Sequence, residues 1–308
     1  MSARRYYPVG SLVTADTDLT VTPEAAGWAY CGLEVRTLAA GDSIAVTLDG
    51  REAAVLPLSG GPLTVEVDRQ RFELEGRSTV FARVTDAAYL PLGSEARIST
   101  AAGCQIALPS ARATHRYDAA YIDARSVPVE LRGAGPATRQ VTNFLTPASF
   151  AGCDKLVCCE LLTPDGNWSS YPPHRHDGEL AADGSACPVT NEEIYYFRIG
   201  RAGSTEYSST GIGLHRTYTA DGEIGDCAID DYVQVGDGDV YLVPRGYHGP
   251  CVAAPGYPMY YLNVLAGPGS ERTMAFCDDP THHWVRSTWD GTQTDPRCPM
   301  TAHTGVIV

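Results

Sequence analysis

Short runs rich in Val, Ile, Leu and Tyr recur along the chain, and each run is bounded by turn residues. Glycine and proline, 31 and 21 of 308 residues, are spread evenly, so turns recur throughout and long helices are scarce. The pattern predicts a mostly β protein of sandwich or barrel type. The expected strands are Leu33–Leu38, Ile44–Leu48, Ala53–Leu58, Leu63–Val67, Val80–Val84, Lys155–Leu162, Glu193–Ile199, Gly213–Thr219, Val240–Val243 and Met259–Leu265.

The stretch between Ala124 and Asn143 carries linker-type residues and no strong apolar period. We therefore expect residues 126–143 to be a linker between an N-terminal unit, residues 1–125, and a C-terminal unit, residues 144–308.

An internal repeat supports two copies of one unit. A strand that ends in glycine is followed in each half by a Pro-containing turn: Glu52–Gly60 with Leu90–Glu95, and Glu192–Gly200 with Val243–His248. In this alignment Glu193 lies opposite Ala53 and His248 lies opposite Glu95, and no histidine precedes His115. We expect only the second copy to hold a metal ion.

Composition narrows the class of partner. The chain is 44% hydrophobic and 19% charged, with a formal net charge of −14, so a nucleic acid or an anionic membrane would be repelled. No apolar run approaches the roughly 18 residues of a membrane span, and no apolar segment follows the N-terminal MSARRYYPVG. We expect a cytoplasmic protein with a small-molecule partner, and ten reduced, mostly buried cysteines, since no CxxC pair occurs.

The strongest chemical signal is the HxH sequence of His174 and His176. Side chains alternate along a strand, so both imidazoles project from one face and can chelate one ion. Glu193 and His248 would complete a set of three histidines and one carboxylate. Such a set suits one divalent ion, with Zn, Mn, Fe and Ni all open, and leaves positions for substrate oxygens.

The spacing of these residues resembles the two metal motifs of the cupin superfamily. Six residues separate Glu193 from Gly200, as in the first motif, which favours Glu193 over Glu192; five residues separate Gly238 from Pro244-Arg245-Gly246, as in the second. Two features depart from the motifs: Asp177–Asn191 must loop out, and His248 comes one residue early. The resemblance implies an all-β bicupin, with two β-sandwich or jelly-roll barrels in tandem.

Longer strings resemble the 5-deoxy-glucuronate isomerases of inositol catabolism over nearly the whole chain: RQVTNF, SSYPPHRHD, EEIYYFRI, LVPRGYHGP and YYLNVLAGP. The resemblance implies conversion of 5-deoxy-glucuronate to 2-deoxy-5-keto-gluconate through a metal-stabilised enediol, without an organic cofactor. The alternatives are 5-keto-4-deoxyuronate isomerisation in pectin breakdown and a non-catalytic cupin that binds a sugar acid. A homo-oligomer is a further expectation, because cupin sheet edges are often covered by partner subunits.

The group that moves the proton is less well defined. Asp177, His215, Tyr247 and Tyr261 lie near the ligands in sequence and are the candidate catalytic residues. For the substrate carboxylate we favour Arg245, which lies in a turn, over Arg175 and Arg198, whose place in strands directs them away from the ligands.

Overall fold

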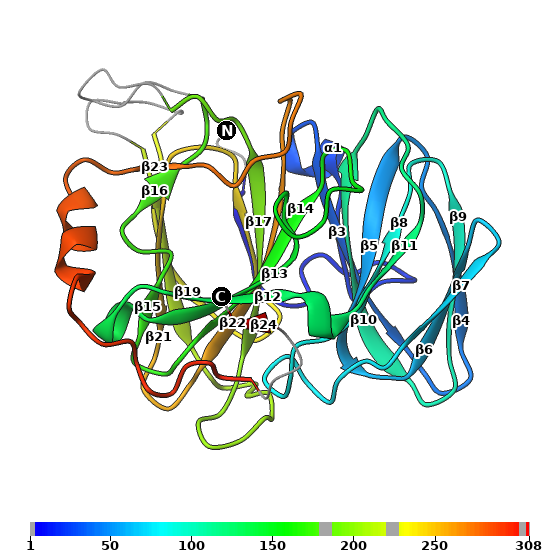
Figure 1. The fold of residues 1–308 in the computed structure, drawn as a ribbon, viewed down its shortest axis with the longest axis horizontal. Helices are drawn as coiled ribbons and strands as arrows, with labels where there is room; N and C mark the ends of the chain where they lie inside the picture. The colour runs from blue at the N-terminus through cyan, green and yellow to red at the C-terminus, as the bar shows by residue number, and fades with distance from the viewer. Residues whose placement is uncertain (1–3, 179–186, 220–227, 302–305, 308) are drawn as a thin grey trace.

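The apolar runs pair into sheets that form two β-barrels side by side, seen in Figure 1 with the first barrel in blue and cyan. This computed structural model describes residues 4–178, 187–219, 228–301 and 306–307. Within those residues every strand pairing is antiparallel except that of β12 with β24. Antiparallel strands need only short turns between them, which explains the even spread of glycine and proline.

The first barrel is built from a six-stranded and a four-stranded sheet. The six-stranded sheet has the order β11 (Ala120–Ile122), β8 (Ala87–Leu90), β5 (Arg51–Gly60), β10 (Cys104–Arg112), β3 (Cys31–Leu38) and β2 (Leu19–Val21). The four-stranded sheet has the order β4 (Ser43–Thr47), β9 (Glu95–Thr100), β6 (Leu63–Val67) and β7 (Gln70–Leu74).

The second barrel has a large sheet of eight strands and a smaller one of six. The large sheet has the order β1 (Tyr6–Tyr7), β20 (Val240–Val243), β17 (Glu192–Ile199), β22 (Met259–Ala266), β14 (Val157–Thr163), β13 (Arg139–Leu145), β12 (Pro128–Arg132) and β24 (Val306–Ile307). The smaller sheet has the order β19 (Asp230–Val235), β18 (Gly213–Tyr218), β21 (Tyr247–Ala253), β16 (His174–Arg175) and β23 (Cys277–Asp278), with β15 (Trp168–Ser169) also paired to β21.

Helices are few and short in the described part of the chain. The α-helix α1 (Pro23–Ala26) begins after Thr22, whose side chain accepts a hydrogen bond from the backbone N–H of Ala25, and ends at Gly27 with a positive φ of 74°. The 3₁₀ helices among the described residues are Ala124–Ser126, Gly135–Ala137 and His283–Trp289. The last of these lies on the outer side of the second barrel (Figure 1).

Three buried apolar clusters follow the layers. One fills the first barrel and includes Val55, Val65 and Ile98. A second fills the second barrel. The third joins residues of the two large sheets, for example Leu56 with Leu262, so the two barrels share a continuous apolar interface.

One expected strand is absent. Val80–Val84 forms turns instead of a strand, because its apolar side chains pack into the cluster between the barrels. The expected linker, residues 126–143, contains β12 and most of β13, which pair with each other and with β14 in the eight-stranded sheet. The other expected strands are present within one or two residues at each end. The division of the chain at residues 125 and 144 remains a prediction.

The strand register agrees with the alignment of the internal repeat. β5 lies between β8 and β10, as β17 lies between β20 and β22, and residues aligned in sequence have partners aligned in sequence. The matching pairs are Ala53 with Leu90 and Glu193 with Val243 in the large sheets.

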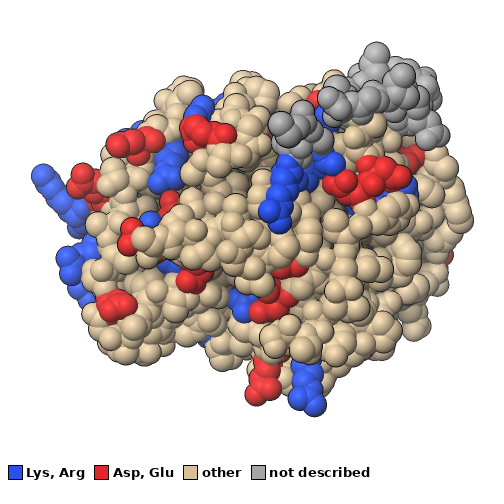
Figure 2. All heavy atoms as spheres, turned by 180° about the vertical axis from the view of Figure 1, so that it is seen from behind, with Lys and Arg blue, Asp and Glu red and all other residues tan. Residues whose placement is uncertain are grey.

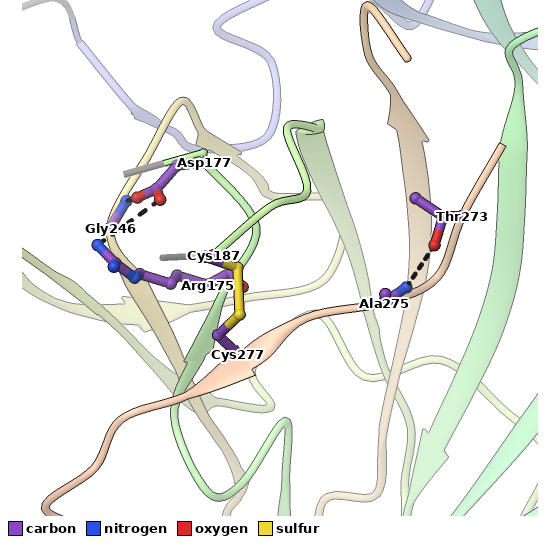
Figure 3. Close-up of a disulfide and its surroundings, with 7 residues drawn as sticks. All are labelled: Arg175, Asp177, Cys187, Gly246, Thr273, Ala275 and Cys277. Carbon is purple, nitrogen blue, oxygen red and sulfur yellow. Dashed lines mark hydrogen bonds and ion pairs between the residues drawn. A yellow bond between two sulfur atoms is a disulfide. The ribbon is translucent and has the colours of Figure 1, made fainter. Parts of the chain in front are cut away.

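The expectation that all cysteines are reduced is wrong for one pair. Cys187 and Cys277 form a disulfide that closes a sequence separation of 90 residues (Figure 3). Proximity explains the pairing, since Cys277 in β23 lies opposite Arg175 in β16 and Cys187 Sγ lies 3.3 Å from the Arg175 carbonyl oxygen. Seven other cysteines among the described residues are free and buried.

The surface is mixed in charge. On the face shown in Figure 2, acidic and basic groups are interspersed among uncharged residues. None of the helices in the described residues has the length and apolar character needed to cross a bilayer.

Candidate metal centre and its cavity

A cavity lies in the second barrel. Alternate residues of four neighbouring strands face it, as the pleat of a sheet requires. From these strands come Arg139 and Val141 of β13, Cys159 and Leu161 of β14, Glu193 and Tyr195 of β17, and Asn263 and Leu265 of β22. The rest of the lining is Arg132, Ser170, His174, His176, Met274, Phe276 and Arg286.

Three of the four predicted metal ligands meet beside this cavity, and two of them, His176 and Glu193, line it. Potential ligand atoms of His176, Glu193 and His248 lie within 4.8 Å of one another, and all three residues are buried. Glu193 Oε2 is 3.0 Å from His176 Nε2 and 3.1 Å from His248 Nε2. The three come from the segment after β16, from β17 and from β21, so the barrel fold assembles the group from distant parts of the chain.

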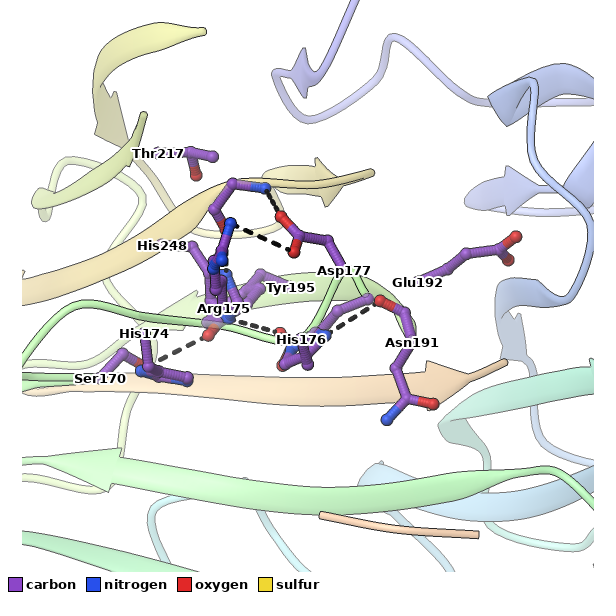
Figure 4. A network of polar contacts seen from close by, with 12 residues as sticks. Ser170, His174, Arg175, His176, Asp177, Asn191, Glu192, Tyr195, Thr217 and His248 are labelled. Atoms are coloured by element: carbon purple, nitrogen blue, oxygen red, sulfur yellow. Dashed lines mark hydrogen bonds and ion pairs between the residues drawn. The ribbon is translucent and has the colours of Figure 1, made fainter. Parts of the chain in front are cut away.

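His174 lies beside this group but is not a member of it. Its ring centroid is 4.5 Å from that of His248 and 6.4 Å from that of His176 (Figure 4). Its place opposite His248 in the β16–β21 pair keeps the imidazole at the cavity wall. The full set of four ligands remains a prediction.

Backbone carbonyls orient all three histidines in the same way. The Nδ1 atoms of His174, His176 and His248 lie 3.3, 2.9 and 3.2 Å from the carbonyl oxygens of Pro172, Asn191 and Gly246. A carbonyl can only accept a hydrogen bond, so each Nδ1 carries the proton and each Nε2 of a neutral imidazole keeps its lone pair. A hydrogen bond from the ring nitrogen that does not face the metal is the usual way in which proteins orient metal-binding histidines.

This arrangement fits a divalent cation. Neutral imidazoles held in this way direct their Nε2 lone pairs toward the negatively charged Glu193 carboxylate. These groups repel one another unless a proton or a cation lies between them. His248 Nε2 is buried and has no hydrogen-bond partner among the described residues, although the Glu193 oxygen lies 3.1 Å away. Two or three imidazoles and a carboxylate match the donors that first-row divalent ions prefer.

The pKa values of these groups reflect burial and their mutual contact. Burial opposes the charged form of Glu193, but contacts with His176 and His248 outweigh it and hold the pKa of this carboxyl well below its usual range. Burial also opposes the charged form of His176, while Glu193 raises its pKa overall. Burial, together with the neighbouring histidines, lowers the pKa of His174 well below its usual value. Glu193 is therefore anionic at neutral pH.

The stem of the inserted segment positions His176. The backbone N–H of Asn191 donates to the His176 carbonyl at 2.8 Å, and Asp177 forms a β-bridge with Thr190. The insertion expected over Asp177–Asn191 thus begins and ends beside the metal ligands, while residues 179–186 lie outside the described part of the chain.

Asp177 and Tyr247 lie on the far side of β16 and β21 from the cavity. Asp177 accepts a hydrogen bond from the Gly246 N–H at 2.7 Å and lies 3.7 Å from the Arg175 guanidinium (Figures 3 and 4). Arg175 lies over the ring of Tyr247 at 5.2 Å. Neither Asp177 nor Tyr247 lines the cavity, and the same is true of Arg245. Their catalytic and binding roles are not supported by this placement.

His215 is enclosed by other side chains deeper in the barrel. Its Nδ1 lies 3.1 Å from Cys251 Sγ and its Nε2 2.9 Å from Thr217 Oγ1, and it is not part of the cavity lining. Burial, and next the nearby His248 imidazole, lower its pKa to about 3. His215 is thus held as a neutral, packed imidazole.

Tyr261 reaches the cavity through Ser170. Its hydroxyl is 2.9 Å from Ser170 Oγ, which also lies 3.2 Å from the hydroxyl of Tyr195, and both Ser170 and Tyr195 line the cavity. Burial raises the pKa of both phenols well above the usual value, so they stay protonated at neutral pH. Sequence reasoning did not single out Ser170 and Tyr195, although both lie in strings that resemble the isomerases.

The cavity also holds three arginines that sequence reasoning did not assign. Arg132 and Arg139 are directly opposite each other in the β12–β13 pair, and Arg286 comes from the 3₁₀ helix His283–Trp289. Arg139 is the first residue of RQVTNF, one of the strings that resemble the isomerases, and that resemblance was the signal that could have pointed to it.

The fold and the site together define a class: a two-barrel cupin, or bicupin, with a His/Glu metal-type group in the second barrel. In the described residues of the first barrel, the positions aligned with Glu193 and His248 are occupied by Ala53 and Glu95. The chain belongs to the KduI/IolB family, whose model matches residues 9–285.

Named relatives match over most of their length. The 5-deoxy-glucuronate isomerase of Geobacillus kaustophilus (strain HTA426) is 39% identical over 267 residues, which cover 86% of this chain and 89% of the relative. The enzyme of the same name from Bacillus subtilis (strain 168) is 33% identical over 279 residues, covering 90% and 92%.

Solved structures agree on the fold. An IolB-like protein from Salmonella typhimurium LT2 has a TM-score of 0.79 at 30% identity and covers 92% of this chain and 99% of its own. The oxalate decarboxylase of Bacillus subtilis, described with Mn(II) centres, has a TM-score of 0.60 at 10% identity, covering 90% and 80%, which is a likeness of fold alone.

Proposed function

We propose that this protein is a metal-dependent aldose–ketose isomerase that converts 5-deoxy-glucuronate to 2-deoxy-5-keto-gluconate. The observation that carries the proposal is the buried group of His176, Glu193 and His248 in a cation-lined cavity, in a chain whose relatives are named for this activity. A small uronic acid is the partner; a cytoplasmic location and a homo-oligomer are part of the same proposal.

His176, Glu193 and His248, joined by His174, would hold one divalent ion. Bound there, the ion supplies Lewis acidity that makes the C–H bond beside the substrate carbonyl more acidic. Asn263, whose buried Nδ2 has no hydrogen-bond partner in the described structure, lines the same cavity and is placed to bind a substrate hydroxyl. The apolar wall of Leu161, Leu265 and Phe276 limits the access of water.

The proton-transfer route that the contacts favour runs through Tyr195, Ser170 and Tyr261. The Ser170 hydroxyl bridges two phenols that remain protonated. A hydroxyl group of this row that donates a proton toward the cavity can regain one from the hydroxyl group beside it. Of the four candidate catalytic residues, Tyr261 is the one that this row of hydroxyl groups connects to the cavity.

The test is proton NMR of 5-deoxy-glucuronate in D₂O with metal-loaded protein, chelated protein and two variants. His176→Ala removes a ligand, so metal content and turnover should both fall by at least about 100-fold, which is more than the loss of a group hydrogen-bonded to a ligand would cause. The matched control is His115→Ala, an exposed histidine in the first half of the chain, which should stay within about twofold of the unaltered protein.

Ketose formed only by metal-loaded protein with His176 intact would support the proposal. If fully loaded protein leaves 5-deoxy-glucuronate unchanged, the proposal is wrong. A parallel tube with 5-keto-4-deoxyuronate then separates the pectin-type isomerase from a protein that binds a sugar acid without converting it.

A further inference from the structure

Arg139 differs from the other two arginines of the cavity. Arg132 donates to both carboxylate oxygens of Glu130, at 3.0 and 2.7 Å, and Arg286 makes a two-point contact with Asp278, at 2.5 and 2.6 Å. Arg139 has no carboxylate within ion-pair distance among the described residues. Two of the three cations are thus neutralised by the protein itself, and the third is not.

The guanidinium of Arg139 is buried with most of its donors unused. Only 4% of the residue is exposed, Nη1 donates to the Ala137 carbonyl at 3.1 Å, and Nε has no hydrogen-bond partner in the described part of the chain. Burial, and next Arg132, lower the pKa of Arg139 to about 10, so it is still charged at neutral pH. An unpaired buried charge is costly unless a ligand completes it.

The surroundings hold this costly arrangement in place. Arg132 and Arg139 are opposite each other across the strand pair, where like charges are destabilising. The side chain lies over the ring of Trp289 at 5.6 Å. Gly133, at a φ of 79°, lets Nη1 approach closely, since a Cβ there would lie 2.7 Å from it. The Arg139 guanidinium is thus an unneutralised cation inside a protein whose net charge is −14.

From this geometry we infer that Arg139 binds the substrate's carboxylate in a two-point contact, with the metal-type group of the same cavity facing the carbonyl end of the sugar. The inference rests on the proposed function for the identity of the substrate. It replaces Arg245, which does not line the cavity, as the anchor. It also assigns acid specificity to the pocket: a uronic acid binds and the corresponding neutral sugar does not.

The test compares 5-deoxy-glucuronate with 5-deoxy-glucose, which has a hydroxymethyl group in place of the carboxylate. Binding to metal-free protein is measured by titration calorimetry, so no turnover is needed. Arg139→Gln should weaken binding of the acid by about 100-fold, the loss of one charge-assisted pair, and leave binding of the neutral sugar within about twofold. Arg139→Lys, which keeps the charge without the fork, should fall between.

Two controls separate an anchor from a structural residue. Arg198→Lys alters another buried arginine of the eight-stranded sheet, paired with Asp237 outside the cavity, and should leave both affinities within about twofold. Thermal denaturation of Arg139→Gln should give a Tm no lower than that of the unaltered protein, because the change removes an uncompensated buried charge.

The outcomes distinguish this inference from the proposed function. Equal loss of both sugars in Arg139→Gln, or equal retention of both, would overturn the anchor whether or not the protein isomerises. If loaded protein fails to isomerise 5-deoxy-glucuronate while Arg139→Gln still loses the acid selectively, the proposed reaction is wrong and the anchor stands. Should Arg139→Gln not fold, the acid-to-neutral affinity ratio of Arg139→Lys decides in the same way.

Discussion

His215 is a neutral imidazole enclosed by Tyr195, Phe197 and Tyr241, and its pKa of about 3 makes it sensitive to acid. In the unfolded chain a histidine titrates near 6.5. Because the folded pKa is the lower one, the stability that His215 contributes is complete above about pH 6.5 and is lost as the pH falls toward 3.

Replacing His215 with glutamine should therefore make the unfolding free energy depend less on pH in the acid range. Between about pH 6 and pH 4, the unaltered protein should lose up to about 1.4 kcal/mol of unfolding free energy per pH unit relative to His215→Gln. Urea denaturation at several pH values measures this difference. His115→Gln, at an exposed site, serves as the control, and parallel profiles for His215→Gln and the unaltered protein would contradict the argument.

The metal-type residues could be predicted from sequence because the HxH period and the glycine spacings are local patterns. His176, Glu193 and His248 meet as those patterns indicate. Ser170 and Arg139 could not be predicted in the same way, because their nearness to the group depends on which strands pair and in what register. Proximity in sequence favoured Arg245, but the sheet brings in Arg139 from β13.

At the level of elements, apolar runs located most strands correctly and failed where burial has another cause. Val80 and Val84 are apolar because they pack between two barrels, and a turn can do this as well as a strand. β13 was hidden because Arg139, Gln140 and Thr142 are polar yet buried. Arg139 lines the cavity and Gln140 is hydrogen-bonded to Thr301, so polar residues occupy positions where a core strand would be apolar.

The disulfide between Cys187 and Cys277 joins β23 to another segment of the second barrel, and its presence can be tested. Because Cys187 and Cys277 are oxidised, thiol titration of denatured, unreduced protein should find two fewer thiols than titration after reduction. Cys277→Ser should lower the unfolding free energy by about 2 to 4 kcal/mol relative to oxidised protein, since the bridge closes a long loop. Cys104→Ser, at a buried free thiol in the first barrel, is the control for thiol counting. An equal count before and after reduction would exclude the bridge.

At the scale of the whole molecule, a glutamate of each barrel accepts hydrogen bonds from backbone N–H groups of the other barrel. Glu192 of β17 accepts hydrogen bonds from the backbone N–H groups of Ala29, Tyr30 and Cys31, at the start of β3. Glu52 of β5 accepts from three backbone N–H groups just before β14 and from a tyrosine hydroxyl. Its donors are Asp154, Lys155, Leu156 and Tyr89. Because Glu52 and Glu192 are aligned in the repeat, the contact is reciprocal and joins the two copies.

This reciprocity explains the adjacent glutamates of β17. Successive residues of a strand face opposite sides of the sheet, and Glu193 lines the cavity. Figure 4 shows Glu192 pointing away from the group of histidines, and its carboxylate reaches the first barrel. One strand thus supplies both a metal-type ligand and a tie between the barrels. The first barrel keeps the tie, Glu52, and has Ala53 where the ligand would be.

Replacing Glu52 or Glu192 with glutamine should therefore lower the unfolding free energy of the protein without lowering its metal content. Glu52→Gln leaves an amide group facing backbone donors in a fully buried place and should cost about 3 kcal/mol of unfolding free energy, with a smaller cost for the less buried Glu192→Gln. Urea denaturation measures the cost, and Glu73→Gln, on an exposed strand, should change it by less than about 0.5 kcal/mol. Metal content of folded Glu192→Gln should match the unaltered protein, while Glu193→Gln should lose the ion. Loss of metal in Glu192→Gln, or unchanged stability in both tie variants, would show that the two neighbouring carboxylates do not divide these roles.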